Sequence, residues 1–317
     1  MITSGKIKDI VTISKLSVCG ISEPSLDEKY ILQIKRWLDC GYHAEMEWMK
    51  RTKDDRMDIR KRIPWVKSVL VVLDNYFSEP ISAKNGIKFS RYAMGRDYHN
   101  IVKEKLTAVL VGIKDIDKRI KGEIYVDTGP VPEKAYAEQA GMGWIGKNGV
   151  FIGNGIGSYC FIGILFLSVN IKPSEMTAGR CGSCTLCIDR CPAGAIIEPG
   201  LIDSNKCISY LTIEKKGDFS DRDAAFLDKW VYGCDVCQEA CPWNRKWSKT
   251  TFEPRYIDRK DQIQKYIELG NAGNIDKFTK VFKNTAIERL KFKRIQRNMN
   301  AALQWPKKCI DFEKEVE

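Results

Sequence analysis

CGSCTLCIDRCPAGAI, residues 181–196, is the stretch that decides how the middle of this chain folds. Its four cysteines follow x2, x2 and x3 spacings, and the last of them precedes a proline. This is the bacterial ferredoxin pattern, in which three thiolates hold one [4Fe–4S] cube and the fourth reaches a second cube. A second run, YGCDVCQEACPWN at 232–244, has x2 and x3 spacings, and Cys207 lies upstream of it. The sequence therefore predicts two [4Fe–4S] clusters and one-electron transfer.

The spacing also predicts which cysteines share a cube. A tight x2-x2 loop can bring three sulfurs to one cube, and the proline after the fourth cysteine turns the chain away. Exchanging the fourth cysteines gives Cys181, Cys184, Cys187 and Cys241 for cluster one, and Cys191, Cys207, Cys234 and Cys237 for cluster two. Paired C-x2-C units also form four-thiolate zinc sites, so zinc is the alternative. Zinc, however, does not need three cysteines at x2-x2 spacing.

The chain has 317 residues and a formal net charge of +11, which is unevenly spread. Residues 242–317 contain 18 Lys and Arg against 10 Asp and Glu, which is +8 of the total. A basic excess at one end favours a polyanionic partner, although a solvated surface accounts for it equally well.

Neither a signal segment nor a membrane span is expected. The chain begins MITSGKIKDIV, without the charged and then apolar pattern of a leader. The longest apolar run, at 159–169, is too short to cross a bilayer. We therefore expect a soluble, cytoplasmic protein with reduced thiols, in which Cys19, Cys40, Cys160 and Cys309 serve packing.

Strands and helices alternate irregularly in the first half. The pattern predicts strands at 68–73, 87–92, 123–126, 149–152 and 160–169, and helices at 25–39, 97–111 and 133–140. Ser25 and Glu28 read as a capping box for the first helix. Because a regular βαβ rhythm is missing, we predict an α+β domain over 1–172. Loops and short helices around the clusters are expected over 173–246, and a basic helical segment over 247–317.

Gly141, Gly143 and Gly146 match the dinucleotide-binding fingerprint by letter only. That fingerprint needs a strand before the glycines and a helix after them. Here a helical segment, EKAYAEQA, precedes the glycines and an extended one, GVFIG, follows them. We therefore expect no NAD or FAD on this loop, but a turn that lets a large flat ligand approach the backbone.

Asp127, in VDTGP at 126–130, lies at the expected end of a strand, where catalytic side chains are often displayed. Two interpretations are open. The side chain caps the next helix, or it faces an apolar pocket, where desolvation would raise its pKa and make it a proton donor. The chain has two histidines, His43 and His99. His99, at an expected helix start, is equally well structural or functional.

A basic stretch near the C-terminus is interleaved with apolar residues. Its cations are Arg289, Lys291, Lys293, Arg294 and Arg297, and its apolar residues are Leu290, Phe292 and Ile295. On a helix the apolar side chains would pack inward and the cations would face outward. Such a face could contact phosphates, with Lys215 beside it, or it could be merely solvated.

Several further motifs accompany the two cysteine runs. They are RYAMGRDYH (91–99), VDTGP (126–130), GWIGKN (143–148), GSY (157–159), CISYLT (207–212) and RNMNAAL (297–303). In this combination the chain resembles the epoxyqueuosine reductase family, cobalamin-dependent enzymes of the last step of queuosine synthesis in tRNA. The resemblance covers nearly the whole chain, and VDTGP together with YGCDVCQ is its most specific part.

The resemblance implies a nitroreductase-like cobalamin-binding domain, a ferredoxin-like domain with two [4Fe–4S] clusters, and a short helical C-terminal tail. It also implies base-off cobalamin, Asp127 as the proton donor to the epoxide, and an external low-potential electron donor of the ferredoxin or flavodoxin type. The implied corrin contacts are Arg56, Ser90, Asp127, Lys147, Phe151, Ile162, Ser209, Asp235 and Val236. The implied tRNA contacts are Lys215, Arg289, Lys291, Lys293, Arg294 and Arg297. We expect a monomer.

The chain departs from the family in two respects. Many members have longer helical-repeat tails, which predicts a smaller grip on tRNA here. The Asp-x-His-x-x-Gly cobalamin motif is absent, because Val102 stands where glycine is required, and this agrees with base-off binding without a histidine ligand. The rival interpretations are a reductive dehalogenase acting on a small organohalide and a ferredoxin-type electron carrier. The basic tail disfavours the first, and the large α+β domain disfavours the second.

Overall fold

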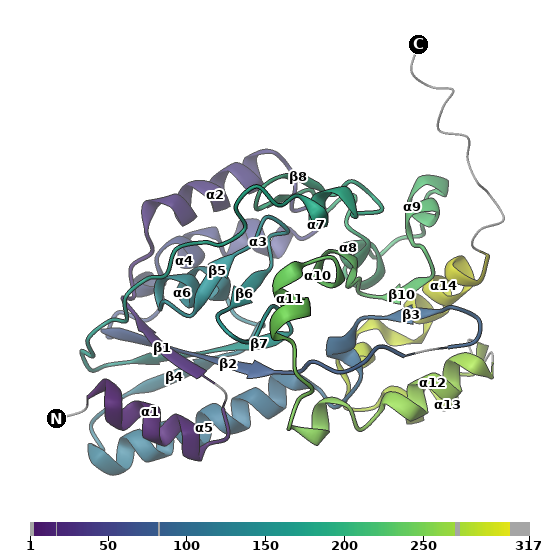
Figure 1. Cartoon of the computed structure of the whole chain (residues 1–317). Helices are drawn as coiled ribbons and strands as arrows, with labels where there is room; N and C mark the ends of the chain where they lie inside the picture. Colours follow the sequence, from purple (N-terminus) through teal and green to yellow (C-terminus); the bar gives the residue numbers. More distant parts are fainter. Residues whose placement is uncertain (1–2, 17, 82, 270–272, 305–317) are drawn as a thin grey trace.

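A four-stranded antiparallel sheet forms the centre of the first half of the chain (Figure 1). The computed structural model describes residues 3–16, 18–81, 83–269 and 273–304. The strand order is β1 (Val18–Ser22), β2 (Ser68–Asn75), β7 (Cys160–Leu167) and β4 (Gly122–Tyr125). β2 and β7 pair along their whole length, so they form the middle of the sheet.

Helices cover both faces of this sheet. One face carries α1 (Ser4–Ile13) and α5 (Tyr98–Ile116), and the other carries α2 (Glu28–Asp39) and α6 (Glu133–Gln139). Side chains of β2 alternate between the two sides, as strand geometry requires. Leu70 and Val72 pack in the core with α5, whereas Val69 and Val71 pack in the core with α6. Because both faces are buried, β2 has the nearly continuous apolar sequence SVLVVL.

Shorter elements complete the first half. They are α3 (Glu47–Arg51), α4 (Lys53–Met57), η1 (Ile59–Lys61), β3 (Lys88–Phe89), η2 (Arg91–Ala93), β5 (Gly143–Ile145) and β6 (Phe151–Gly153). β5 and β6 form a hairpin that contains the glycine-rich turn. Since α6 precedes this turn and a strand follows it, the order is the reverse of a dinucleotide-binding unit.

Short elements also surround the cysteines. In chain order they are α7 (Leu186–Asp189), β8 (Ile196–Glu198), β9 (Leu201–Ile202), α8 (Ile208–Ile213), α9 (Asp221–Phe226), β10 (Trp230–Tyr232), α10 (Val236–Glu239) and α11 (Pro242–Trp247). α7 and α10 each contain one cysteine of a C-x2-C pair, and the two helices touch. The two cysteine runs therefore lie side by side.

The C-terminal helices share a core with both earlier parts. They are η3 (Pro254–Tyr256), α12 (Lys260–Glu268), α13 (Ile275–Phe282), η5 (Ala286–Leu290) and α14 (Lys291–Gln304). Phe89, Tyr232 and Ile295 lie in this one buried core. The fully buried Asn298 donates from Nδ2 to the carbonyl oxygens of Thr212 (2.7 Å) and Val231 (2.8 Å). Side chains from all three predicted domains thus pack in one core. The predicted domain boundaries at 172 and 246 stay a prediction.

The predicted fold class is confirmed, but some element ends differ. The capping box at Ser25 is wrong, because the N-cap of α2 is Asp27 and Ser25 pairs with Asp58 in an isolated β-bridge. The strand predicted at 87–92 is only β3, because Arg91 begins a 3-10 turn. Among the residues in the four described ranges, no helix is both long and apolar enough to span a membrane.

Candidate functional site

Asp127 lies in a tightly held loop after β4. Its backbone φ is +58°, a left-handed conformation that is uncommon for residues with a side chain. The Asp127 N–H donates to Oε1 of Glu133, at the start of α6, at 2.6 Å. The Arg56 guanidinium donates to the carbonyl oxygens of Gly129 (3.1 Å) and Val131 (3.4 Å). These contacts fix the strained backbone and with it the direction of the Asp127 side chain.

Two polar side chains meet at the Asp127 carboxylate. The Tyr98 hydroxyl donates to Oδ2 at 2.7 Å, and Nε2 of His99 lies 3.4 Å from the same oxygen. The other ring nitrogen of His99, Nδ1, lies 2.5 Å from Oδ1 of Asp97. The Tyr98 ring stacks on Phe161 with centroids 4.1 Å apart. Asp97, His99 and Asp127 therefore form a row of contacting side chains. The Asp127 side chain at its end is 55% exposed, so a substrate can reach this carboxylate.

The charges in this group are coupled. Burial alone would raise the pKa of Asp127, but the nearby His99 ring and the hydrogen bond from Tyr98 outweigh burial and lower the pKa. Burial alone would lower the pKa of His99, but its contacts with Asp127 and Asp97 raise it to about 9. The pKa of Glu133 is raised to about 8, first by burial and then by the charge of Asp127. At neutral pH Asp127 is therefore ionised, while His99 and Glu133 hold protons.

These results correct both interpretations of Asp127 drawn from the sequence. The residue does not cap α6, whose N-cap is Pro132 and has no side-chain cap. It does not have a pKa raised by an apolar pocket either, because polar neighbours lower that pKa. Sequence reasoning missed Tyr98 and Glu133. The signal for Tyr98 was its place beside His99, whereas nothing local connects Glu133 with Asp127.

The cysteines of predicted cluster one line one cavity. This cavity, about 220 Å³ in volume, is lined by the four of them and by Lys147, Arg180 and Trp243. The indole Nε1 of Trp144 donates to Sγ of Cys181 at 3.4 Å, a contact of the kind that tunes cluster potentials. In the part of the chain that the structure describes, no three His, Cys, Asp or Glu side chains are arranged to hold a single metal ion.

The cysteines of predicted cluster two are also neighbours. Burial raises the pKa of the Cys237 thiol, and the nearby Cys207 and Cys191 thiols raise it further. Burial also raises the pKa of the Cys234 thiol, and the nearby Cys237 and Cys207 thiols raise it further. The Ala195 N–H donates to Sγ of Cys191 at 3.3 Å. The structure thus brings each predicted set together, and the ligand assignments stay a prediction.

Three of the predicted corrin contacts adjoin cluster two. Ser209, Asp235 and Val236 each lie within two residues of a cluster-two cysteine in the sequence. A macrocycle held there would lie beside that cluster, as electron transfer to it requires. The Asp235 carboxylate, however, is fully buried and accepts from Ser90 Oγ at 2.5 Å and from the Arg91 N–H at 2.9 Å. The side chains of Asp235 and Ser90 therefore hold two segments of the protein together.

The other predicted corrin contacts are more dispersed. Arg56 binds the Asp127 loop, and Lys147 lines the cluster-one cavity. Phe151 is buried in the sheet core, and Ile162 packs partly buried against the same core. No contact described here joins these four, so their role toward a cofactor stays a prediction.

The predicted tRNA-contacting helix is only partly free. Leu290 and Ile295 are buried, as the pattern predicted. The expectation that all five cations face outward is wrong for Arg294 and Arg297. Arg294 Nη1 donates to the Ile213 carbonyl oxygen at 2.8 Å, and Arg297 Nη1 donates to that of Lys215 at 3.1 Å. The physical reason is that carbonyls at and after the end of α8 lack helical partners and take guanidinium donors instead.

The remaining predicted tRNA contacts fall into two kinds. Arg289 forms an ion pair with Glu214, and Lys215 lies 3.5 Å from Asp223. Lys291 and Lys293 are exposed at the start of α14. These two lysines are therefore the strongest candidates for phosphate contact.

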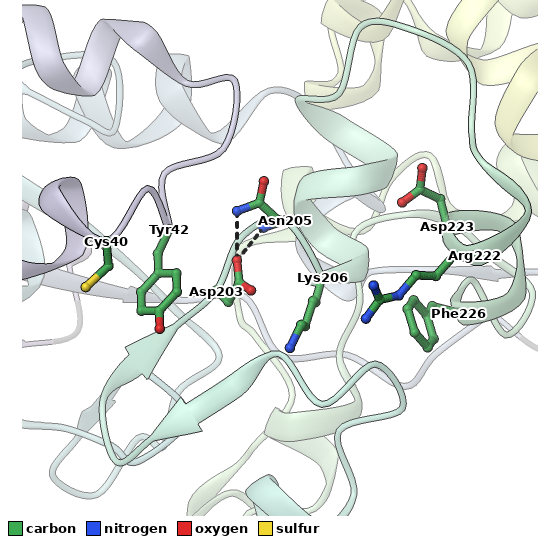
Figure 2. A pocket seen from close by; sticks show the side chains of 8 residues that line it. All are labelled: Cys40, Tyr42, Asp203, Asn205, Lys206, Arg222, Asp223 and Phe226. Carbon is green, nitrogen blue, oxygen red and sulfur yellow. Dashed lines mark hydrogen bonds between the residues drawn. The ribbon is translucent and has the colours of Figure 1, made fainter. Parts of the chain in front are cut away.

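A second cavity of about 390 Å³ lies between the end of α2 and α9 (Figure 2). It is lined by Cys40, Tyr42, Asp203, Asn205, Lys206, Arg222, Asp223 and Phe226. The Asp203 carboxylate accepts from the backbone N–H and Nδ2 of Asn205 at 3.0 and 2.9 Å. Lys206 directly precedes Cys207, so the cavity borders predicted cluster two. Sequence reasoning gave Cys40 only a packing role and the other lining residues none, because they come from three separate segments.

Two known protein families match this chain. The family described as "4Fe-4S double cluster binding domain" matches residues 180–244, and the family described as "Epoxyqueuosine reductase QueG, DUF1730" matches residues 56–128. Residues 180–244 therefore form a domain that binds two [4Fe–4S] clusters, and the zinc alternative is set aside.

Individual relatives are similar over most of their length. An epoxyqueuosine reductase of Cyclobacterium marinum is 37% identical over 91% of this chain and 94% of its own. The one of Escherichia coli K12 is 35% identical over 90% of this chain and 76% of its own. A crystal structure of epoxyqueuosine reductase with an epoxyqueuosine-modified tRNA-Tyr stem loop matches with a TM-score of 0.82 and 25% identity, covering 93% of this chain and 80% of that one. Together with the cysteine sets, these similarities show that the chain belongs to the epoxyqueuosine reductase family.

Proposed function

We propose that this protein reduces epoxyqueuosine in tRNA to queuosine, with cobalamin and two [4Fe–4S] clusters as cofactors. The proposal depends on one observation in a member of this reductase family. The Asp97 carboxylate contacts the His99 ring, and the other side of that ring faces the accessible carboxylate of Asp127. The substrate follows from the names of the relatives and from the stem loop in the solved structure. We further propose a cytoplasmic monomer that takes electrons from an external carrier of the ferredoxin or flavodoxin type.

The reaction turns an epoxide into an alkene and water, so it consumes two electrons and two protons. Cobalamin, reduced through the clusters one electron at a time, would supply the strongly reducing chemistry at the epoxide carbon. Ser209, Asp235 and Val236 would hold it beside cluster two. Their fit rests on their closeness to the cluster-two cysteines, and it involves the backbone of Asp235, because the carboxylate is already engaged.

The protein's own side chains supply the protons. An alkoxide is a poor leaving group, so the departing oxygen must be protonated, and a placed acid contributes roughly 10²–10⁴-fold to such a step. Because Asp127 is ionised at neutral pH, it must first receive a proton. The Tyr98 hydroxyl is nearer, but burial and Asp127 raise its pKa well above the ordinary value. The proton source is therefore the protonated His99, which lies 3.4 Å from Oδ2. Asp97, on the other side of the ring, stabilises the imidazolium and holds its orientation.

Glu133 is the second protonated group at this site. Its Oε1 accepts from the Asp127 N–H at 2.6 Å, so it also holds the strained loop. A neutral carboxyl beside an ionised carboxylate can return a proton to the pair after the first one is used. His99 and Glu133 together therefore match the two protons of the reaction.

The RNA would rest on exposed cations of the C-terminal part. Lys291 and Lys293 carry this role first, with Arg289 and Lys215 at the edge of the same region. Bases in single-stranded loops can leave the stack and enter a protein site. The modified nucleoside would reach Asp127 in this way while the loop phosphates stay on the surface.

Substitution of Asp127 by asparagine tests the proposal. The variant should keep iron, sulfide and the corrin spectrum, and it should lose roughly 10²–10⁴-fold in turnover of epoxide-bearing tRNA, because the proton carrier is gone. Asp115→Asn, which changes an exposed aspartate in the last turn of α5, serves as the matched control. Turnover of Asp127→Asn at the parent rate would remove Asp127 from the mechanism.

A further inference from the structure

The two clusters have different surroundings. The predicted corrin contacts Ser209, Asp235 and Val236 all adjoin cysteines of cluster two. The cluster-one cavity is instead lined by Arg180 and Pro242, which are exposed. An electron that travels to the cofactor through both clusters would therefore enter at cluster one.

Three tryptophans pack beside the cluster-one cysteines Cys181 and Cys241, and one of them, Trp243, lines the cavity. Trp144 packs edge-on against Trp243 and Trp247, with ring centroids 5.4 and 6.0 Å apart, and Trp243 lies 4.6 Å from Trp247. Trp243 Nε1 donates to the Arg180 carbonyl oxygen at 3.1 Å, which ties α11 to the segment before the first cysteine. The packed rings therefore hold Trp243, which lines the cavity and is partly exposed, in a fixed position at its edge.

The surface around this edge is basic. Arg180, Arg245 and Lys246 are exposed, and no ion pair involves any of them in the described ranges. Lys246 stands over the Trp243 ring, with Nζ 5.7 Å from its centroid. The segment that follows Arg180 also carries an exposed apolar side chain. This is Leu186, which lies between Cys184 and Cys187 and is 39% exposed. We call Arg245, Lys246, Trp243, Arg180 and Leu186 the α11 face.

We propose that an acidic one-electron carrier protein docks on the α11 face and passes its electrons to cluster one. This inference rests on the proposed function, since it says where the electrons of that reaction enter. Tunnelling falls steeply with distance, so a carrier must sit directly over the cluster. Each docking delivers one electron, the carrier being oxidised and cluster one reduced, and two such events supply one reaction.

The composition of the α11 face favours a protein partner over RNA. Transient redox partners meet on small surfaces with an apolar centre and charges that steer the encounter. Leu186 and Trp243 supply the apolar part, and the unpaired cations suit a carrier rich in carboxylates. The predicted RNA contacts Lys291 and Lys293 lie on a different element, α14.

The test replaces Arg245 and Lys246 by glutamate in the anaerobically purified holoenzyme. Two readouts are compared with the parent: the Kd for oxidised flavodoxin at low ionic strength, and turnover with reduced flavodoxin or with titanium(III) citrate. We expect Kd and the KM for flavodoxin to rise on the order of tenfold, because attraction becomes repulsion. The rate with titanium(III) citrate should not change. Lys103→Glu with Lys114→Glu, exposed on α5, is the control with the same change of charge.

The outcomes separate the alternatives. An unchanged Kd for flavodoxin overturns the proposal, and so does an equal loss in the α5 control. Weaker binding of the tRNA stem loop with unchanged flavodoxin binding would make the α11 face an RNA surface instead. If the glutamate variant loses iron, Arg245→Gln with Lys246→Gln replaces it, and a reduced salt dependence of flavodoxin binding is then the supporting result. A parent without titanium-supported turnover would refute the proposed function, while the flavodoxin Kd still tests the docking.

Discussion

Glu133→Gln should remove a specific part of the pH dependence of the reaction. The pKa of Glu133 is about 8, so the neutral fraction of this carboxyl falls from about nine tenths at pH 7 to about one tenth at pH 9. If the neutral form is needed, this carboxyl alone should lower the parent rate about tenfold over this range. Glu133→Gln keeps an oxygen that can accept from the Asp127 N–H, but it carries no proton to give. The geometry of the Asp127 loop should survive, and the fall in rate near pH 8 should disappear from the pH–rate profile.

The remaining pH dependence should belong to His99. The pKa of His99 is about 9, so the alkaline limb of Glu133→Gln should move from about 8 to about 9. The rate of the variant at pH 7 should also drop, on the order of 10²-fold, because one of the two proton sources is lost. The assay is a single turnover of an epoxide-bearing stem loop with titanium(III) citrate between pH 6.5 and 10, with nucleosides quantified by mass spectrometry.

The pH dependence of the free energy of unfolding gives an independent check of the Glu133 pKa. Glu133 has a folded-state pKa raised from 4.5 to about 8, so the folded protein holds more protons than the unfolded chain between these values. Its contribution to folding is therefore fully present below pH 4.5 and is lost as pH rises through 8. Glu133→Gln should gain stability relative to the parent at pH 8, measured by urea unfolding. A variant whose rate limb stays at pH 8 would refute the assignment of that proton to Glu133.

Other predictions follow from contacts outside the Asp127 site. Lys105→Met should lower the free energy of unfolding by about 3–5 kcal/mol, because Nζ of Lys105 lies 2.6 Å from a buried Asp74 oxygen that would lose its cation and keep only the Tyr256 hydroxyl. Urea unfolding measures this, and an unchanged midpoint would contradict it. Arg297→Lys should lower stability by about 1–3 kcal/mol, since its carbonyl contacts are lost, and should leave the salt slope of tRNA binding unchanged. Lys291→Gln with Lys293→Gln should reduce that slope by about 0.7 per lysine, and a flat response would show that they are only solvated.

The sequence predicts the cysteine clusters better than the rest of the site, because most of these cysteines lie close together in the sequence. The cysteine sets follow from loop spacing, because x2-x2 turns leave few ways to reach a cube. The structure accordingly surrounds one cavity with Cys181, Cys184, Cys187 and Cys241. Likewise the burial of Leu290 follows from helical periodicity alone.

The contacts that the sequence does not predict join distant segments or depend on unpaired backbone groups. Glu133 reaches Asp127 because a turn folds α6 back onto the end of β4. Arg294 and Arg297 look like surface cations on a helical wheel. They turn inward because carbonyls at and after the end of α8, in another part of the chain, need donors. Periodicity describes one helix at a time and cannot anticipate such donors and acceptors.

Electrons and protons should be supplied through separable parts of the molecule. The α11 face borders cluster one, whereas the proton sources His99 and Glu133 belong to α5 and α6, and no contact described here joins the two groups. Effects of distant sites without shared partners are additive in free energy. Glu133→Gln combined with Arg245→Glu and Lys246→Glu should therefore lower flavodoxin-supported turnover by the product of the separate factors.

The same combination should leave each signature intact. Its flavodoxin Kd should equal that of the Arg245 and Lys246 variant, and its pH profile with titanium(III) citrate should equal that of Glu133→Gln. A combined loss clearly smaller than the product would mean that slow electron entry hides the proton step, which the titanium assay bypasses. If the shortfall persists with titanium(III) citrate, proton supply depends on the state of cluster one, and the separation argued from the contacts fails.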